Sequence, residues 1–389
     1  MSLPEEVNEQ TLLEICADMA SESQTLDFKR ILPGRDDRGK AEFLKDVCAM
    51  ANSSGGDLVY GIDELDNGGL TLAPIAGESV DAATRRLGQV LDSGIEPRLV
   101  GVRMMEVRLR EGYALIVRVA PSFNGPHRFN MNGHTKFVSR TGTHTSELSY
   151  EQLRAAFDRT ATLSERARVF CANRLELISE GKSPIPLISG PVCVLQAVPV
   201  TSMSSDFAVD VAALYRGGFE RFMRPGWGGA SRSLNLDGLL VFPGARRDQG
   251  SVGYVQVFRT GALEAASYGG NFQNDRKLIP STNVSMFYRQ AIETSLHHFR
   301  RSGVVGPAVF SASLLNVGDY EFGVGSQIFH FDALTADRPS MVLPEHWTDN
   351  VETADVDAVA RPILDILWQA FSVERCLEYA QDGTWRPTA

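Results

Sequence analysis

The chain has little of what marks a secreted, membrane-spanning or zinc-binding protein. Its five cysteines are an odd number, lie far apart and form no C-x-x-C pair, so we expect no disulfide framework, no structural zinc and a reducing, cytoplasmic setting. No apolar run of about 18 residues is present, which predicts no membrane span. The start, Met1-Ser-Leu-Pro-Glu-Glu, lacks the basic and apolar regions of a signal peptide. No G-x-x-x-x-G-K-S/T run occurs, which argues against a P-loop ATPase.

The composition is that of a soluble globular protein. The chain has 389 residues, of which 43% are hydrophobic and 22% charged, and this length is enough for two or three domains. The net charge of −10 disfavours nucleic-acid binding when only the total is considered. The charge is uneven, however, because residues 98–140 carry eight basic and two acidic side chains. This segment is either a basic stripe that binds a phosphate backbone or a set of ordinary solvated strand faces.

The first 160 residues alternate between helical and extended patterns. Asn8 can cap a helix, and the chain then becomes extended through residues 25–29. Side chains two apart share a face of a strand, so Asp27 and Lys29 point together, away from the core that Leu26 and Phe28 face. The other predicted elements are helices near 39–52, 75–94 and 149–161 and strands near 57–63, 99–109, 113–120 and 137–140. This order predicts an α/β fold with a mixed sheet.

The rest of the chain predicts a second domain, so we expect domains at residues 1–162 and 163–389. Helical patterns cover about 166–180, 284–301 and 356–380, and Thr260-Gly261 indicates a hairpin. Strands are predicted near 192–200, 239–242, 252–259 and 309–315. The pattern is that of an α/β or α+β domain, and it contains no catalytic constellation.

Three acids and one lysine near the start are candidates for a metal-dependent site. Glu22, Asp27 and Lys29 fall within eight residues, and Asp63 ends an apolar strand. Mg²⁺ and Mn²⁺ prefer carboxylate and water oxygens, so Glu22, Asp27 and Asp63 are candidate metal ligands. Such a metal would orient a water and stabilise charge on a phosphate, while Lys29 pairs with that phosphate. The plainer alternative is that these are exposed strand, helix-end and turn residues.

Four sequence blocks resemble the Schlafen AlbA_2 domain. They lie within residues 8 to about 162, in the order typical of that family. The blocks are Glu22-Ser-x-x-Leu-Asp-Phe-Lys29, Ala49-x-Ala-Asn-Ser-x-Gly-Gly56, Tyr60-Gly-Ile-Asp63 and Lys136-Phe-Val-Ser-Arg-Thr-Gly142. The resemblance implies an N-terminal mixed-sheet domain of that family.

The resemblance also implies an activity and its site. Animal Schlafen proteins of this type resemble metal-dependent endoribonucleases that act on transfer and ribosomal RNA. By spacing, Glu22 and Asp27 match the family's pair of acids, although the second is usually glutamate. Either Asp63 or Glu64 matches the third acid.

The function expected from this resemblance is Mg²⁺- or Mn²⁺-dependent cleavage of structured RNA such as tRNA, in a toxin or phage-defence role. The alternatives are a non-catalytic nucleic-acid-binding regulator and a nucleotide-binding sensor. The expected RNA contacts come from the basic segment: Arg118, Arg128, Lys136 and Arg140. The animal relatives carry two copies of the domain and this chain carries one set of the blocks, which predicts a homodimer.

Overall fold

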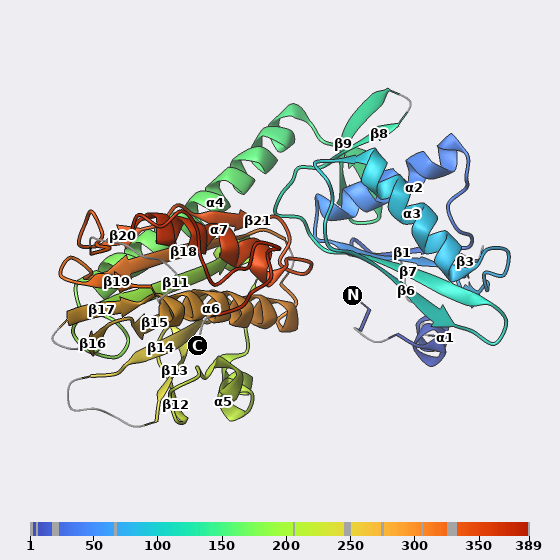
Figure 1. Ribbon diagram of the computed structural model, residues 1–389. Coiled ribbons are helices and arrows are strands. Elements are labelled where there is room, and N and C mark those ends of the chain that lie inside the picture. The colour runs from blue at the N-terminus through green and yellow to red at the C-terminus, as the bar shows by residue number, and fades with distance from the viewer. Residues whose placement is uncertain are drawn as a thin grey trace. The chain divides into compact units, whose positions relative to one another are not determined.

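The chain divides into two compact units, residues 1–162 and 163–389, each with its own core. The structure is a computed structural model, drawn in Figure 1. It describes residues 3–4, 7–17, 23–65, 68–131, 133–204, 207–244, 250–273, 276–304, 306–324 and 333–387. Within these ranges, no helix combines the length and the apolar character needed to cross a lipid bilayer.

The first unit is built on a four-stranded mixed sheet, as predicted. β1 runs parallel to β2, whereas β2 and β7, and β7 and β6, are antiparallel. In order across the sheet, the strands are β1 (Leu26–Lys29), β2 (Gly56–Tyr60), β7 (Tyr113–Val119) and β6 (Val102–Arg108). The predicted strand near 57–63 is broken at Gly61, whose φ of 102° favours glycine; β3 (Ile62–Glu64) follows and pairs with β4 (Leu70–Leu72).

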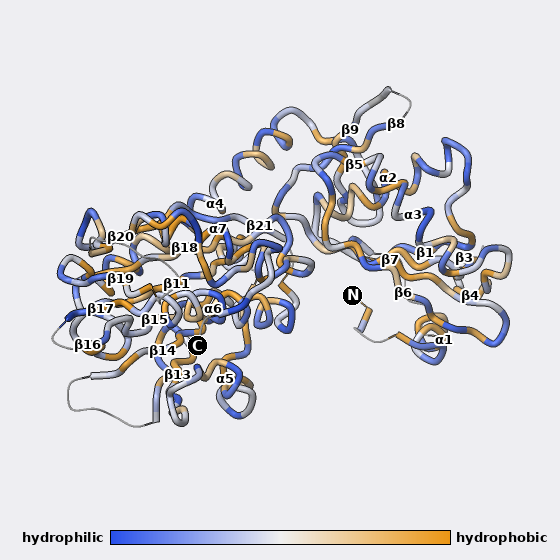
Figure 2. Tube along the Cα trace, in the orientation of Figure 1, coloured by the Kyte–Doolittle hydropathy of each residue, from blue (hydrophilic) through white to orange (hydrophobic). Residues whose placement is uncertain are grey.

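Both faces of this sheet are covered. Leu58 and Tyr60 of β2 pack with α2 (Asp37–Ala51) and α3 (Val80–Gly94) on one face. Val59 lies on the other face with the apolar side of α1 (Glu9–Ala17). Hydrophobic residues accordingly run along β7 in the middle of the unit (Figure 2). A strand residue that points away from one core therefore points into another.

A second sheet closes the unit beside α2. The prediction of one short strand near 137–140 was incomplete, because that segment is the middle of an antiparallel sheet. In order, its strands are β10 (His144–Glu147), β9 (His134–Thr141), β8 (Arg128–Met131) and β5 (Ile95–Glu96). The separate helices predicted near 149–161 and 166–180 are one element, α4 (Tyr150–Ser179), which begins in the first unit and ends in the second.

The second unit is an α+β arrangement around an eight-stranded sheet (Figure 1). Alternate residues of its central strand point to opposite cores. Leu195 packs with the helices on one face, and Val194 packs with Ile178 of α4 on the other. In order, the strands are β12 (Ala230–Leu234), β13 (Gly238–Pro243), β14 (Gly253–Phe258), β15 (Leu263–Tyr268), β11 (Val192–Pro199), β18 (Ala308–Leu315) and β20 (Met341–Val342), with β21 (His346–Thr348) also on β18.

The remaining elements of this unit are helices and a small sheet. The predicted hairpin at Thr260-Gly261 joins β14 to β15, whereas the helix expected over 356–380 ends earlier. The helices are α5 (Val211–Arg216), α6 (Ser281–Arg301) and α7 (Val356–Gln369), and the three-stranded sheet contains β16 (Asn271–Gln273), β17 (Arg276–Pro280) and β19 (Glu321–Gly323).

Candidate active site in the first unit

Asp27 lies between two cations beneath α2. Its Oδ2 is 2.7 Å from Lys29 Nζ, and its Oδ1 is 3.3 Å from Arg140 Nη2. The expectation that Asp27 and Lys29 share a strand face fits this contact. The expectation that Asp27 is partly exposed is wrong: the residue is 3% exposed, because α2 covers the face to which it points. Lys29 keeps 38% of its side chain exposed, so it reaches solvent from this site.

Arg140 is held by hydrogen bonds to two segments that are distant from it in sequence. Its backbone N–H donates to Ser53 Oγ at 2.8 Å, and its guanidinium donates to the carbonyl oxygen of Ser23 at 3.2 and 3.3 Å. Gln24 Nε2 donates to Ser54 Oγ and to the carbonyl oxygen of Arg140. The blocks around residues 23–29, 52–56 and 136–142, which are distant in sequence, therefore meet at this one arginine.

Asp46 of α2 is a member of the site that sequence reasoning missed. Its Oδ2 is 3.8 Å from Lys29 Nζ, and its Oδ1 is 3.8 Å from Lys45 Nζ. Burial raises the pKa of the Asp46 carboxyl, and the nearby Lys29 ammonium partly offsets this. The signal was available in the helix pattern, because Asp46 is an acid among the buried positions Phe43, Val47 and Met50.

These side chains line an open cavity of about 490 Å³. Its floor is formed by Asp27, Asp46 and Tyr60, and the turn between β9 and β10 contributes Thr143 and His144. The volume falls within the range of about 300–1,000 Å³ that is usual for small-ligand sites.

Asp63 lies outside this cavity. It follows Gly61, pairs with Thr71 across the β3–β4 hairpin and places Oδ2 3.3 Å from Arg30 Nη1. Glu64, the alternative third acid, is exposed on the same hairpin. Glu22 lies outside the described residues. The structure therefore brings together Asp27, Lys29 and Arg140 from the predicted site, and adds Asp46.

The described residues do not by themselves fit a divalent metal. Asp27 has a cation at each carboxylate oxygen, so a metal would have to displace Lys29 or Arg140. Among the described residues, no group of three or more His, Cys, Asp and Glu side chains is placed to hold one.

The four predicted RNA contacts fall into two classes. Arg118 donates to Asp57 at 2.7 Å and to the carbonyl oxygens of Leu3 and Pro4, and Arg140 is 4% exposed. Both arginines hold the fold together, and neither presents a free cation. Arg128 and Lys136 are 40% and 50% exposed, and each makes a surface ion pair that a phosphate can exchange with at little cost.

Comparison with known families assigns the part of the chain that contains this site. Residues 22–149 match the family model described as Schlafen, AlbA_2. The first unit contains a Schlafen AlbA_2 domain. Its family is associated with nucleic-acid-related functions. No curated protein matches the chain.

Two solved structures are similar to part of this chain. One is the N-terminal domain of a putative ATP-dependent DNA helicase RecG-related protein from Nitrosomonas europaea, with 22% identity over 33% of this chain and 84% of that chain, and a TM-score of 0.27. The other is the DIP2311 protein from Corynebacterium diphtheriae, with 18% identity over 36% of this chain and 30% of that chain, and a TM-score of 0.26.

Proposed function

We propose that the Schlafen AlbA_2 unit binds structured RNA such as tRNA and cleaves its backbone in the Asp27 cavity, in a toxin or phage-defence role. The observation that carries the proposal is the contact of Lys29 with both Asp27 and Asp46 at the floor of an open cavity. A half-exposed ammonium held between two carboxylates is pre-positioned to receive a phosphate oxygen, which is how electrostatic stabilisation of phosphodiester cleavage works.

Each residue then has a separate task. Lys29 binds the phosphate and stabilises the charge that develops on it. Asp27 holds Lys29 in place, and Arg140 holds Asp27 through the other carboxylate oxygen. Asp46 has its pKa shifted upward by burial, which is the direction required for a carboxyl that exchanges a proton with the reacting groups. The predicted requirement for Mg²⁺ or Mn²⁺, with Glu22, Asp27 and Asp63 as ligands, stays a prediction that the experiment below tests.

One observation favours a second candidate, a nucleic-acid-binding regulator without catalysis. Asp27 is neutralised on both sides by Lys29 and Arg140, and this leaves the buried carboxylate with the environment of a structural ion pair. A unit with this geometry would bind RNA and leave it intact.

The deciding experiment is incubation of the full chain with total tRNA and Mg²⁺ or Mn²⁺, with and without chelator. We expect cleavage. Its loss on chelation would support the predicted metal requirement, and cleavage that survives chelation would contradict that requirement. Lys29→Met should lower the cleavage rate by at least about a hundredfold, because one stabilising charge is removed from the transition state.

Lys40→Met is the matched control. Lys40 is on α2, is paired with Asp37 and does not line the cavity. If Lys29→Met and Lys40→Met cleave equally fast, the assigned site is wrong. If the unsubstituted chain retards RNA in a gel and never cleaves it, the regulator is the correct candidate.

A further inference from the structure

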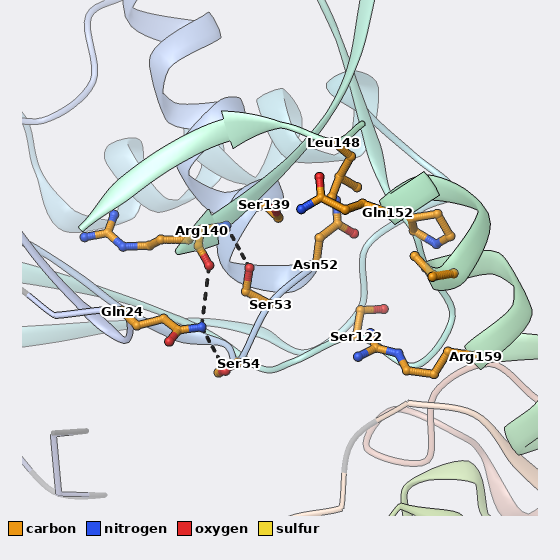
Figure 3. A pocket seen from close by; sticks show the side chains of 14 residues that line it. Gln24, Asn52, Ser53, Ser54, Ser122, Ser139, Arg140, Leu148, Gln152 and Arg159 are labelled. Carbon is orange, nitrogen blue, oxygen red and sulfur yellow. Dashed lines mark hydrogen bonds between the residues drawn. The ribbon is translucent and has the colours of Figure 1, made fainter. Parts of the chain in front are cut away.

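A second cavity of about 420 Å³ lies beside the Asp27 cavity, and Arg140 lines both (Figure 3). It is bounded by the turn that ends α2, by the loop around Ser122–Pro126, by β9 and by the first turns of α4. Gln24 borders it on the side of β1. All of its lining residues belong to the first unit.

The walls of this cavity are fixed by contacts between distant segments. Asn52 Nδ2 donates to the carbonyl oxygens of His127 at 2.7 Å and Val138 at 2.8 Å, which joins α2 to the loop and to β9. Thr160 Oγ1 donates to the carbonyl oxygen of Gly125 at 2.9 Å, which joins α4 to the same loop. The cavity is therefore formed before any ligand arrives, as ligand sites usually are.

The lining combines an apolar wall with a polar rim. The wall consists of Pro126, Leu148, Ala155 and Ala156. In Figure 3, Gln152 and Arg159 of α4 lie at the cavity together with the hydroxyl groups of Ser53, Ser54 and Ser122.

The charge of the lining is the second feature. Among the residues that the structure describes, no aspartate or glutamate lines the cavity, although the chain carries a net charge of −10. Within the described part of the chain, no carboxylate lies within ion-pair distance of Arg159, which is exposed. Its charge is therefore available to an anion.

We propose that this cavity holds one unpaired nucleotide of the bound RNA, next to the phosphate in the Asp27 cavity. The base packs on the Pro126–Leu148–Ala156 wall, and Arg159 binds its phosphate. Gln24 Oε1 and Gln152 Nε2 contact the base edge, because the other polar atom of each amide already has a hydrogen-bond partner within the unit. Bases of single-stranded RNA are recognised in this way, through a packed face and hydrogen bonds to the base edge. The inference rests on the proposed RNA-binding function and adds a base preference to it.

The test uses fluorescently labelled hexamers of adenylate, uridylate and cytidylate, with fluorescence anisotropy on the full chain. We expect the chain to prefer one hexamer by at least about fivefold. Ala155→Trp fills the cavity from an exposed position of α4. This variant should lower the affinity for the preferred hexamer at least about tenfold and abolish the preference. Arg159→Ala should lower the affinity for all three hexamers alike. It should also lower the slope of log affinity against log salt concentration by about one.

Two variants on the same helix serve as controls. Ala161 and Arg154 are exposed and do not line the cavity, so Ala161→Trp and Arg154→Ala should bind like the unsubstituted chain. Equal affinity for the three hexamers, or a preference that survives Ala155→Trp, would overturn the inference. Competition by the matching nucleoside monophosphate at hexamer concentrations would assign the cavity to a free nucleotide and also overturn it.

The outcome is separable from that of the cleavage proposal. Lys29→Met leaves this cavity intact and should keep the base preference. If Ala155→Trp abolishes the base preference and the unsubstituted chain never cleaves RNA, this inference holds and the cleavage proposal is wrong. Cleavage by a chain without any base preference upholds the cleavage proposal alone.

Discussion

At the scale of single residues, the pair of Asp27 and Arg140 is the most consequential contact of the first unit. Their side chains are 4% and 3% exposed, and among the described residues Arg140 has Asp27 as its one ion-pair partner, whereas Asp27 also contacts Lys29. Removal of one partner from such a pair leaves an uncompensated buried charge, which typically costs about 3–5 kcal/mol. Replacement of Asp27 therefore tests stability and activity together, whereas Lys29→Met removes a partly exposed side chain and leaves Asp27 paired with Arg140.

We expect Asp27→Asn, which leaves Arg140 buried without a carboxylate, to lower the free energy of unfolding of the first unit by about 3 kcal/mol or more. Arg140→Met should lower it by less, because Asp27 stays paired with Lys29. The double variant should lose at least about 1 kcal/mol less than the sum of the two, because it leaves neither charge unpaired. Urea denaturation followed by far-ultraviolet circular dichroism measures this. All four tryptophans lie beyond residue 163, so tryptophan fluorescence reports an unchanged transition of the second unit. Additive losses would show that the two residues are not coupled.

Strand geometry predicted the direction of Asp27 and Lys29, and it did not predict the burial of Asp27 or the role of Asp46. Alternation along residues 26–29 correctly predicted that Asp27 and Lys29 point together, since that depends on strand geometry alone. The burial of Asp27 depends on which element covers the other face of the sheet, and the sequence of the strand holds no information on that. Asp46 was missed for the same reason, because its role follows from α2 packing over β1.

At the scale of elements, Asn52 and His127 join α2 to the second sheet of the first unit. Asn52 accepts from the backbone N–H of His127 at 2.7 Å through Oδ1 and donates to its carbonyl oxygen. The imidazole is fully buried, with Nδ1 2.8 Å from the carbonyl oxygen of Pro97 and Nε2 2.6 Å from Ser122 Oγ. Burial lowers the pKa of His127 below its usual value near 6.5.

We expect the first unit to lose stability as the pH falls from about 6.5 toward the lowered pKa of His127. In that window the unfolded chain binds the proton more tightly than the folded one, so acidification favours unfolding, and the contribution is fully present above the unfolded value. His127→Gln should reduce the pH dependence of the urea midpoint measured by circular dichroism. The tryptophan-detected transition should show the same pH dependence in both chains. An unaltered dependence of the dichroism midpoint in His127→Gln would contradict the assignment.

Most elements were predictable from periodicity, and the errors have local causes. Gly61 breaks a continuous apolar run into β2 and β3, because its positive φ turns the chain. α4 continues through residues 162–166, where two separate helices were predicted because the apolar side of the helix changes there. Before this point Phe157 packs on Phe137 of the first unit, and after it Ile178 packs in the core of the second unit. A change of packing partner along a helix interrupts the pattern without interrupting the backbone.

At the scale of the whole molecule, charge pairing reduces what one chain offers to RNA. Of the four RNA contacts predicted in the basic segment 98–140, Arg118 and Arg140 are enclosed in ion pairs, and Arg128 and Lys136 are exposed cations with exchangeable partners. The predicted basic stripe is therefore thinner than the number of its basic residues indicates. A single copy of the unit therefore keeps two of the four predicted phosphate contacts.

A homodimer would double these contacts, and we predict one, with Arg128 of both subunits on the same RNA. Light scattering at micromolar concentration should give twice the 42.6 kDa of the chain. Each phosphate contact that is lost lowers the log–log salt slope of binding by about one. Arg128→Ala should therefore lower the slope for tRNA by about two in a dimer and by about one in a monomer. Arg103→Ala, on the edge strand β6, is a comparison for a general change of charge. A monomeric mass with and without RNA, together with a slope change of one, would refute the dimer and leave each chain to bind RNA on its own.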